Sequence, residues 1–338
     1  MDASAAKRAH VPDYYENSYA HFGIHEEMLK DRERTQAYQK AIMRNPHLFK
    51  DKVVLDVGCG TGILSLFAAR AGAKLVVGVD MSSIAEQAEE IVRLNKLSNR
   101  VKIVRGKIED VDLTALGVDK VDIIVSEWMG YMLLYESMLD SVIVARDKWL
   151  RPGGLIFPDR ASLYICALED ADYKSEKIGF WDDVYGFDFS CIKTLALSEP
   201  LIDTVEPSQI MSSAPFKLLD VDITTVQRED LDFTARFALE AARDDHVHGF
   251  LVYFDVEFAA SHKAIGLSTA PGAPYTHWKQ TTFYLREDLI MCEGEVLAGE
   301  FACRRNKLNH RELDVVLTYR FSGRHQDVER AGDEYWIR

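Results

Sequence analysis

Residues 54–62 of the chain read Val-Leu-Asp-Val-Gly-Cys-Gly-Thr-Gly. A short apolar run ends in the pattern Gly-x-Gly-x-Gly, and a helical pattern follows from Leu64. A glycine loop between a strand and a helix is typical of nucleotide-binding α/β sheets, although glycine triplets also occur in ordinary tight turns. Because position 63 is Ile63, the loop does not have the dinucleotide spacing G-x-G-x-x-G.

The segments around this loop alternate between strand and helix. Helices are predicted at 64–71 and 83–97. Strands are predicted at five places, namely 53–57, 75–80, 101–105, 121–125 and 155–157. Because the strands are uniformly apolar and separated by helices, they predict a mostly parallel sheet with both faces covered. Residues 48–157 are therefore expected to form a Rossmann-like α/β domain.

The pattern changes after Pro158. Apolar and polar residues alternate with period two in four stretches, at 216–227, 250–258, 279–285 and 313–321. This alternation is typical of antiparallel strands, so residues 158–338 are expected to form a β-barrel or a sandwich. Residues 170–203 interrupt it with charged and aromatic side chains. They predict either a helical insert packed on its own domain or an arm whose aromatic residues bury against a second copy.

Residues 1–47 make up an N-terminal segment. Its composition over 12–47 predicts a helix that ends before Pro46, because the residue before a proline disfavours the helical conformation. The first residues lack the apolar core of a secretory signal, so none is expected. No run of about 18 apolar residues occurs, so no membrane-spanning helix is expected.

The overall composition limits the class of partner. The formal net charge is −14, which attracts basic partners and disfavours nucleic acid and anionic membranes, although acidity also serves solubility alone. Five scattered cysteines form no C-x-x-C pair, which predicts free thiols in a reducing compartment and no structural zinc. Cys59 lies in the glycine loop, where a helix N-terminus would lower the pKa of a thiol; the alternative is a small packing residue.

Acidic residues surround the glycine loop. Asp56 lies two residues before the first glycine, and Asp80 ends the next strand. An acid about 20 residues after such a loop suits contacts to ribose hydroxyls. Glu109 follows the third strand and is either an acceptor for an adenine amine or a solvated surface acid. Without the phosphate-binding lysine of an ATP loop, these acids favour a cationic sulfonium cofactor, S-adenosylmethionine.

A second motif follows the strand predicted at 121–125. Residues 126–136 read Ser-Glu-Trp-Met-Gly-Tyr-Met-Leu-Leu-Tyr-Glu, so Glu127 and Glu136 bracket an apolar and aromatic loop. A carboxylate buried in such a loop needs a cationic partner, and the planar guanidinium matches two carboxylates best. The motif predicts an enzyme that brings an arginine side chain to the cofactor. The alternative is a pair of acids that only cap the loop.

Four motifs in this order resemble the protein arginine N-methyltransferases, type I branch, over nearly the whole chain. They are Ser18-Tyr19 with His25-Glu26-Glu27-Met28, the glycine loop, residues 126–136, and Tyr275-Thr276-His277-Trp278. Within this family, the sequence resembles a fungal form of the enzyme. The resemblance implies a Rossmann-like methyltransferase domain, a β-barrel-like domain and a helical arm that makes a homodimer or higher oligomer. It also implies S-adenosylmethionine as the cofactor, S-adenosylhomocysteine as the product, and no metal.

The resemblance further implies the reaction and its setting. The expected products are monomethyl and asymmetric dimethyl arginine, on Gly/Arg-rich RNA-binding proteins and histone tails. The expected location is the nucleus and the cytoplasm, without direct nucleic-acid binding and without a membrane.

The resemblance implies a role for individual residues of this sequence. Glu127 and Glu136 match the acids that grip the substrate guanidinium, His277 is expected to pair with Asp31, and the proton acceptor is either Glu136 or this pair. Arg34 matches an arginine that pairs with the cofactor carboxylate. The other cofactor residues are expected to be Tyr19, His25, Asp56, Gly58, Gly60, Asp80, Glu109 and Met138. The acceptor pocket is expected to contain Met28, Tyr131 and Trp278, with Met138 also crowding the acceptor.

One position departs from the family. Glu16 follows Tyr15, where the family carries an aromatic residue over the cofactor. A glutamate there would weaken closure, pair with the sulfonium, or point to solvent. Two rival functions remain at this point: a methyltransferase acting on nucleic acid or a small molecule, and a non-catalytic scaffold that has lost cofactor binding.

Overall fold

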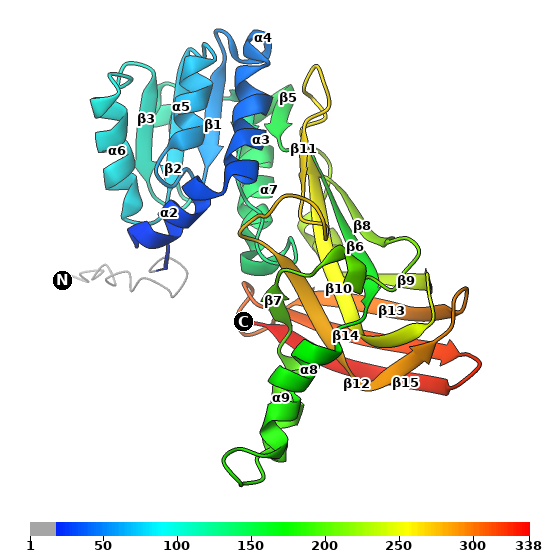
Figure 1. The fold of residues 1–338 in the computed structure, drawn as a ribbon. Helices are drawn as coiled ribbons and strands as arrows, with labels where there is room; N and C mark the ends of the chain where they lie inside the picture. The colour runs from blue at the N-terminus through cyan, green and yellow to red at the C-terminus, as the bar shows by residue number, and fades with distance from the viewer. Residues whose placement is uncertain (1–17) are drawn as a thin grey trace, which may run out of the picture.

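The computed structural model describes residues 18–338 and places an α/β unit beside a β unit that carries a protruding arm (Figure 1). Glu16 lies outside the described residues. In the α/β unit, five parallel strands lie in the order β3-β2-β1-β4-β5. Their bounds are β1 Val53–Val57, β2 Leu75–Asp80, β3 Val101–Arg105, β4 Val121–Val125 and β5 Leu150–Phe157. The helices of this unit are α5 Ile63–Arg70, α6 Ile84–Leu94 and α7 Met138–Trp149, with 3-10 turns η1 Leu113–Leu116 and η2 Tyr135–Ser137.

The N-terminal segment differs from the single helix that its composition predicts. Helices α2 (Phe22–Lys30) and α3 (Arg32–Met43) are separated by Asp31, whose backbone is extended. The Asp31 side chain accepts a hydrogen bond from Arg34 N at 3.0 Å, so it caps α3. Aspartate favours this capping position over a helix interior, which explains the break. As predicted, α3 ends before Pro46, which begins the short helix α4 (Pro46–Phe49).

The rest of the chain is antiparallel β structure, as predicted. A six-stranded sheet has the order β7-β12-β10-β6-β8 with β11 on β10, and a four-stranded sheet has the order β15-β14-β13-β9. The bounds are β6 Arg160–Leu168, β7 Leu201–Asp203, β8 Phe216–Asp222, β9 Phe233–Glu240, β10 Asp245–Glu257, β11 Gly266–Ser268, β12 Gln280–Met291, β13 Val296–Arg305, β14 Leu313–Ser322 and β15 Asp327–Ile337. Short 3-10 turns precede β8 and β9, at η5 Pro207–Gln209 and η6 Arg228–Leu231.

One apolar core runs through both units. Between the two antiparallel sheets, Phe237 packs against Phe250 with ring centroids 5.3 Å apart, and Phe283 packs against Phe301 at 5.7 Å. Between the units, Phe258 lies 4.9 Å from the ring of Tyr38 on α3. All of these side chains are buried. The shared core therefore holds α3 and both sheets in one arrangement, which positions the site between them.

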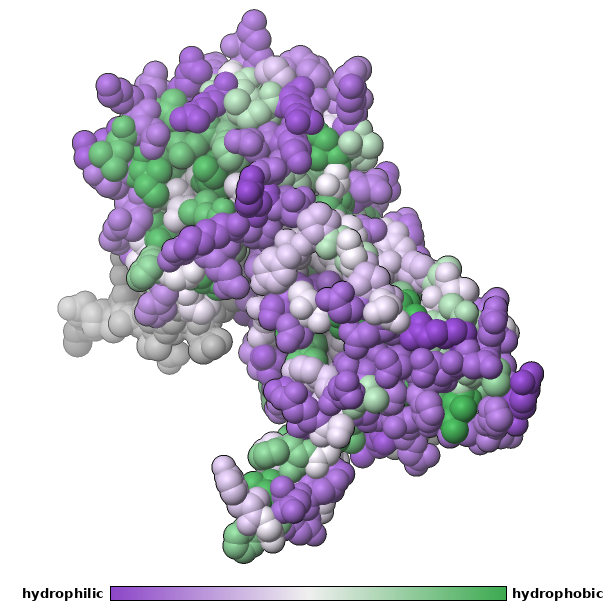
Figure 2. All heavy atoms as spheres, in the orientation of Figure 1, coloured by the Kyte–Doolittle hydropathy of each residue, from purple (hydrophilic) through white to green (hydrophobic). Residues whose placement is uncertain are grey.

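The insert at 170–203 projects from the β unit as an arm (Figure 1). It consists of α8 Ala171–Lys177, η3 Gly179–Asp182, η4 Ser190–Ile192 and α9 Lys193–Ser198. Apolar side chains gather on its visible face (Figure 2). Phe180, Tyr185 and Phe187 are 51%, 96% and 69% exposed, so these aromatic side chains are not packed on their own domain. Across residues 18–338, no helix has the length and apolar character that a membrane crossing requires.

Candidate active site

A cavity of about 540 Å³ opens at the carboxyl ends of the parallel strands. The glycine loop, the end of β2, the residues after β3 and the loop after β4 line it, together with α2, α7 and residues from the β unit. Ligands of open α/β sheets bind at this edge because the strand-to-helix loops converge there. The fold alone therefore brings the two sequence motifs to one cavity.

The glycine loop has a conformation that needs glycine. Gly58 and Gly60 have φ angles of +69° and +53°. A Cβ atom on Gly58 would lie 2.6 Å from Cε of Met138, and one on Gly60 would lie 3.2 Å from the His25 ring. The loop is thus packed tightly against the start of α7 and against α2, and it lines the cavity.

Asp80 fastens this loop to the end of β2. Its Oδ2 accepts from Gly60 N at 2.9 Å, and its Oδ1 accepts from Ser82 N at 2.9 Å and Ser82 Oγ at 2.8 Å. An ionised carboxylate has about four acceptor positions, so these three bonds leave room for one more donor. Glu109 also lines the cavity and accepts from Ser141 Oγ at 2.7 Å. Sequence reasoning missed Ser82 and Ser141, which no motif marks.

Asp56 does not contact the cavity, which corrects the prediction of direct cofactor contact. Its side chain is fully buried behind the glycine loop, and Oδ2 accepts from Ser65 Oγ at 2.7 Å. Burial raises the pKa of Asp56 to about 7. Burial also raises the pKa of the Cys59 thiol well above its ordinary value, so the expectation of a lowered thiol pKa is wrong. Asp56 belongs to the packing beneath the loop, and Cys59 is a buried residue of the loop itself.

The loop after β4, residues 126–137, is named the acceptor loop. Its start is anchored because Ser126 Oγ donates to Val57 O at 2.7 Å and Tyr38 OH donates to Ser126 O at 2.9 Å. Trp278 Nε1 donates to Met129 O at 2.8 Å. Trp278 is buried and does not line the cavity, so it braces the loop rather than forming the predicted pocket wall. Tyr131, also predicted there, lies outside the cavity lining and is 36% exposed.

Glu127 is held on one side and open on the other. Oε2 accepts from Arg34 Nε at 2.9 Å and Nη2 at 2.8 Å, and each side chain of this pair is 8% exposed. Oε1 is buried and has no hydrogen-bond partner among the described residues. Arg34 lines the cavity, and its predicted contact with the cofactor carboxylate stays a prediction; the structure also joins it to the acceptor loop. Met28 is part of the same group, because Arg34 Nη1 donates to its carbonyl oxygen at 3.2 Å.

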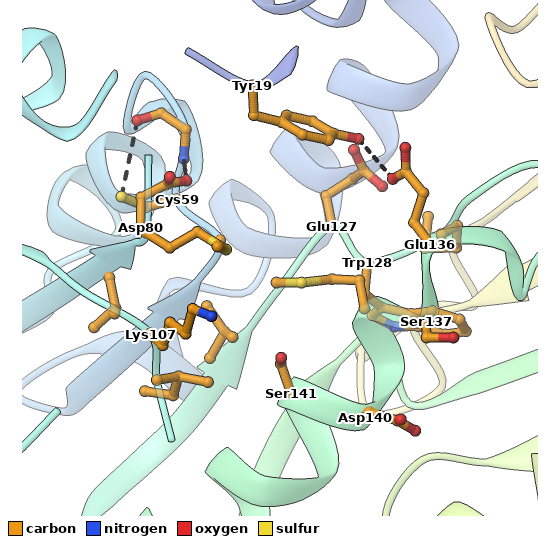
Figure 3. A pocket seen from close by; sticks show the side chains of 18 of the residues that line it. Tyr19, Cys59, Asp80, Lys107, Glu127, Trp128, Glu136, Ser137, Asp140 and Ser141 are labelled. Carbon is orange, nitrogen blue, oxygen red and sulfur yellow. Dashed lines mark hydrogen bonds between the residues drawn. The ribbon is translucent and has the colours of Figure 1, made fainter. Parts of the chain in front are cut away.

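Glu136 lies across from Glu127 and is bound by Tyr19. The Tyr19 hydroxyl donates to Glu136 Oε2 at 2.8 Å, and Figure 3 shows the phenol reaching to this carboxylate. Burial raises the pKa of Glu136 to about 7; the Tyr19 bond lowers it, Glu127 raises it, and Arg311 lowers it. Two nearby carboxylates thus have different environments, one paired with a guanidinium and one whose pKa is raised by burial.

The remaining predicted residues frame these two acids. His277 Nδ1 lies 2.7 Å from Asp31 Oδ2, as the predicted pair requires. Burial alone would raise the pKa of Asp31, but hydrogen bonds from His277 and Arg34 outweigh it and lower the pKa. His25 Nε2 lies 2.8 Å from the Tyr19 carbonyl oxygen, so it attaches the Tyr19 segment to the glycine loop. Over residues 18–338, no group of three or more His, Cys, Asp or Glu side chains is placed to hold a metal ion.

Comparison with known proteins agrees with this geometry. Residues 159–324 match the family described as the arginine methyltransferase oligomerization subdomain, and residues 37–154 match the ribosomal protein L11 methyltransferase family. The chain is 58% identical over 322 residues to protein arginine N-methyltransferase 1 of Schizosaccharomyces pombe, covering 95% of this chain and 94% of the relative. It is 56% identical to the protein of the same name from Chlamydomonas reinhardtii, covering 94% and 91%.

Solved structures show the same fold. A chain of the Trypanosoma brucei PRMT1 enzyme-prozyme heterotetrameric complex with AdoHcy superposes with a TM-score of 0.91 at 49% identity, covering 95% of this chain and 100% of that one. Arabidopsis thaliana protein arginine methyltransferase 10 superposes with a TM-score of 0.85 at 30% identity, covering 96% and 100%. The resemblance inferred from the motifs is confirmed, and the chain belongs to the protein arginine N-methyltransferase family as a type I enzyme.

Proposed function

We propose that Glu127 Oε1 and the Glu136 carboxylate together bind the guanidinium of a substrate arginine. The observation that carries this assignment is the buried Oε1 atom of Glu127, which has no hydrogen-bond partner among the described residues. A buried carboxylate oxygen without a donor is costly, and a guanidinium supplies donors in a planar fork that matches it. Arg34 holds the other oxygen in place, so Oε1 keeps one orientation toward the cavity.

The residues of the cavity fit S-adenosylmethionine. The glycine loop offers backbone without side chains, Asp80 retains capacity for a ribose hydroxyl, and Glu109, which lines the same cavity, would accept from an adenine amine. The cofactor supplies an electrophilic methyl group on a positively charged sulfur. Acidic residues around the cavity suit that positive charge, whereas a phosphate-bearing cofactor would be repelled.

The two carboxylates prepare the arginine for methyl transfer. An arginine guanidinium is a poor nucleophile because its lone pairs are delocalised and its pKa exceeds about 12. Glu127 and Glu136 attract positive charge toward the nitrogens that they face, which leaves the remaining terminal nitrogen richer in electrons. Binding in one orientation also aligns that nitrogen for an in-line displacement. The product cation releases a proton to Glu136 or to the His277–Asp31 pair.

The substrates are proposed to be basic protein segments, namely Gly/Arg-rich RNA-binding proteins and histone tails. The net charge of −14 supports this choice. A second hollow, of about 670 Å³, lies beside His277 between α2, the start of α3 and residues 274–277, and Glu26, Glu27 and Glu33 are among its lining residues. Lys30 and Arg32 also line this hollow, but with Asp31 its acidic side chains outnumber the basic ones, which suits basic residues that flank a methylated arginine. The nucleus and the cytoplasm are the proposed locations.

A peptide assay tests this function. We expect a Gly/Arg-rich peptide incubated with S-adenosylmethionine to give monomethyl arginine and then asymmetric dimethyl arginine, separated by chromatography after hydrolysis. The control is the same peptide with lysine at every arginine, which keeps the charge but removes the planar fork. Methylation of the lysine peptide, or symmetric dimethyl arginine, would contradict the proposed pocket. An absence of methylation with intact cofactor binding would do so as well.

The pKa of Glu136 predicts the pH dependence of this reaction. Glu136 must be ionised to bind the guanidinium, and burial raises its pKa to about 7. We therefore expect kcat/KM for the peptide to rise about tenfold per pH unit below that value and to level off above it. Tyr19→Phe removes a donor that lowers this pKa, so the rising limb should move to higher pH. A profile that is flat from pH 5.5 to 8.5 would refute the assignment.

The arm is proposed to make a homodimer. Tyr185 and Phe187 at its tip are 96% and 69% exposed, and aromatic side chains are enriched at interfaces. We expect Tyr185→Glu with Phe187→Glu to convert dimers into monomers in light scattering, because two carboxylates cannot be buried without partners. Leu308→Glu is the matched control, since Leu308 is 99% exposed and lies outside the arm. Dimers that persist in the arm variant would contradict the proposal.

A further inference from the structure

The backbone of the acceptor loop is held in an unfavourable conformation. Met132, Leu133, Glu136 and Ser137 have φ angles of +50°, +68°, +71° and +55°. Residues with a Cβ disfavour this left-handed region, and such conformations persist only where the surroundings impose them. The contacts that impose them therefore also determine where the Glu136 carboxylate lies.

The two halves of the loop are held differently. The first half closes on itself, because Gly130 N donates to Leu133 O at 3.0 Å and Tyr135 N donates to Tyr131 O at 3.1 Å. The second half is held from the β unit. Glu136 N donates to the carbonyl oxygen of Arg311 at 2.8 Å.

Arg311 also binds the other backbone group of Glu136. Its Nη1 donates to the Glu136 carbonyl oxygen at 2.9 Å, so one residue satisfies both the N–H and the C=O of Glu136. The next residue, Ser137, donates from Oγ to His310 O at 2.5 Å. Arg311 and His310 both line the active-site cavity although they lie about 175 residues further along the chain. The β unit thus reaches into the site at the point of greatest backbone strain.

The turn that carries Arg311 is itself rigid. It joins β13 and β14, and Asn306 organises it: Oδ1 accepts from Leu308 N at 2.9 Å and from Asn309 N at 3.0 Å. The Asn306 side-chain amide donates to both carboxylate oxygens of Asp314, at 2.9 and 3.0 Å. Because β13 and β14 are central strands of the four-stranded sheet, the turn has a fixed base. A fixed base is what a support for a strained loop requires.

We infer that Arg311 is a positioning residue for methyl transfer, which holds the Glu136 carboxylate against the substrate guanidinium and makes the β unit part of the catalytic apparatus. The inference rests on the proposed role of Glu136. The positive charge of Arg311 contributes as well, because it lowers the pKa of Glu136 against the larger effect of burial. Loss of Arg311 therefore changes both the position and the protonation of this acid.

Arg311→Ala tests the inference. We expect kcat for the peptide to fall about 10- to 100-fold, because a charge-assisted hydrogen bond to the loop is lost. The rising limb of the pH profile should move to higher pH, which a merely structural defect would not cause. Binding of S-adenosylhomocysteine in calorimetry should stay within about threefold of the parent, since Arg311 touches the acceptor loop and not the glycine loop.

Two variants control for folding. Arg311→Lys keeps the charge and one donor, so it should recover most of kcat and restore the pH limb. Leu308→Ala changes the same turn at a side chain that is 99% exposed, and it should match the parent protein. If the melting temperature of Arg311→Ala is far below that of the parent protein, the activity of Arg311→Lys decides whether the inference holds. A lysine variant that is folded but inactive would overturn the inference.

A double-mutant cycle separates this inference from the proposed function. In the Glu136→Gln background, Arg311→Ala should cause no further loss, because it acts through the Glu136 carboxylate. Full activity of Glu136→Gln alone would refute the proposed clamp. An inactive Glu136→Gln together with a fully active Arg311→Ala would refute only the positioning role. Additive losses in the double variant would also refute it, since they require an independent path.

Discussion

Glu127→Gln lowers kcat/KM for a Gly/Arg-rich peptide by about a hundred- to several-thousand-fold, if Glu127 binds the substrate guanidinium as proposed. Removing one charge of a buried ion pair costs about 3–5 kcal/mol, and about 1.4 kcal/mol corresponds to a tenfold change in rate. Glutamine has the same shape, and its carbonyl oxygen still accepts from Arg34, so the loop keeps its contacts. Because the buried Arg34 guanidinium then faces a neutral partner, the variant is also expected to be less stable than the parent, and the rates are compared at a temperature where both proteins are folded.

Steady-state kinetics, calorimetry with S-adenosylhomocysteine and thermal melting together check this result. The cofactor affinity should stay near that of the parent, whereas the melting temperature should fall because Arg34 loses its charged partner. Glu90→Gln is the matched control, because Glu90 lies on the surface of α6 in a pair with Arg93. It should leave all three measurements unchanged. A Glu127→Gln enzyme within tenfold of the parent rate would remove Glu127 from the clamp.

Arg34→Ala is expected to destabilise the protein by about 3–5 kcal/mol, because it leaves the Glu127 carboxylate buried without its partner. Both side chains of this pair are 8% exposed, and Arg34 donates twice to the same oxygen. Activity should fall with stability, since Glu127 loses the contact that orients it. Denaturation by urea measures the first effect. Peptide kinetics at a temperature where the variant is folded measures the second.

A second substitution shows whether the unpaired charge of Glu127 causes the loss of stability in Arg34→Ala. Arg34→Ala combined with Glu127→Gln should be more stable than Arg34→Ala alone, because the buried side chain at position 127 that has lost its partner is then neutral. Arg93→Ala is the matched control, since it breaks the exposed Arg93–Glu90 pair and should change stability little. A double variant less stable than either single one would contradict the argument. Weaker S-adenosylhomocysteine binding in Arg34→Ala would support the predicted contact of Arg34 to the cofactor carboxylate.

Local patterns predicted much of the fold. The strands at 53–57, 75–80, 101–105 and 121–125 have the bounds that the sequence predicts, because buried parallel strands are continuous apolar runs. The last strand, β5, begins at Leu150 and not at 155, since Arg151, Pro152 and two glycines hide its first half from any apolar pattern. The helix predicted across Asp31 is two helices, because one capping side chain outweighs the helical composition around it.

The sequence alone indicated the chemistry that we propose for this enzyme: a glycine loop for a nucleoside, two glutamates for a guanidinium, and a net negative charge for basic substrates. These properties depend on residue type and short spacing, so they can be recognised from the sequence alone. Which of these groups contact one another is visible only in the folded protein. Arg34 pairs with Glu127 across 93 residues, and Arg311 binds Glu136 across 175. Contacts of that range follow from how the sheets and the shared core pack, and no local pattern encodes them.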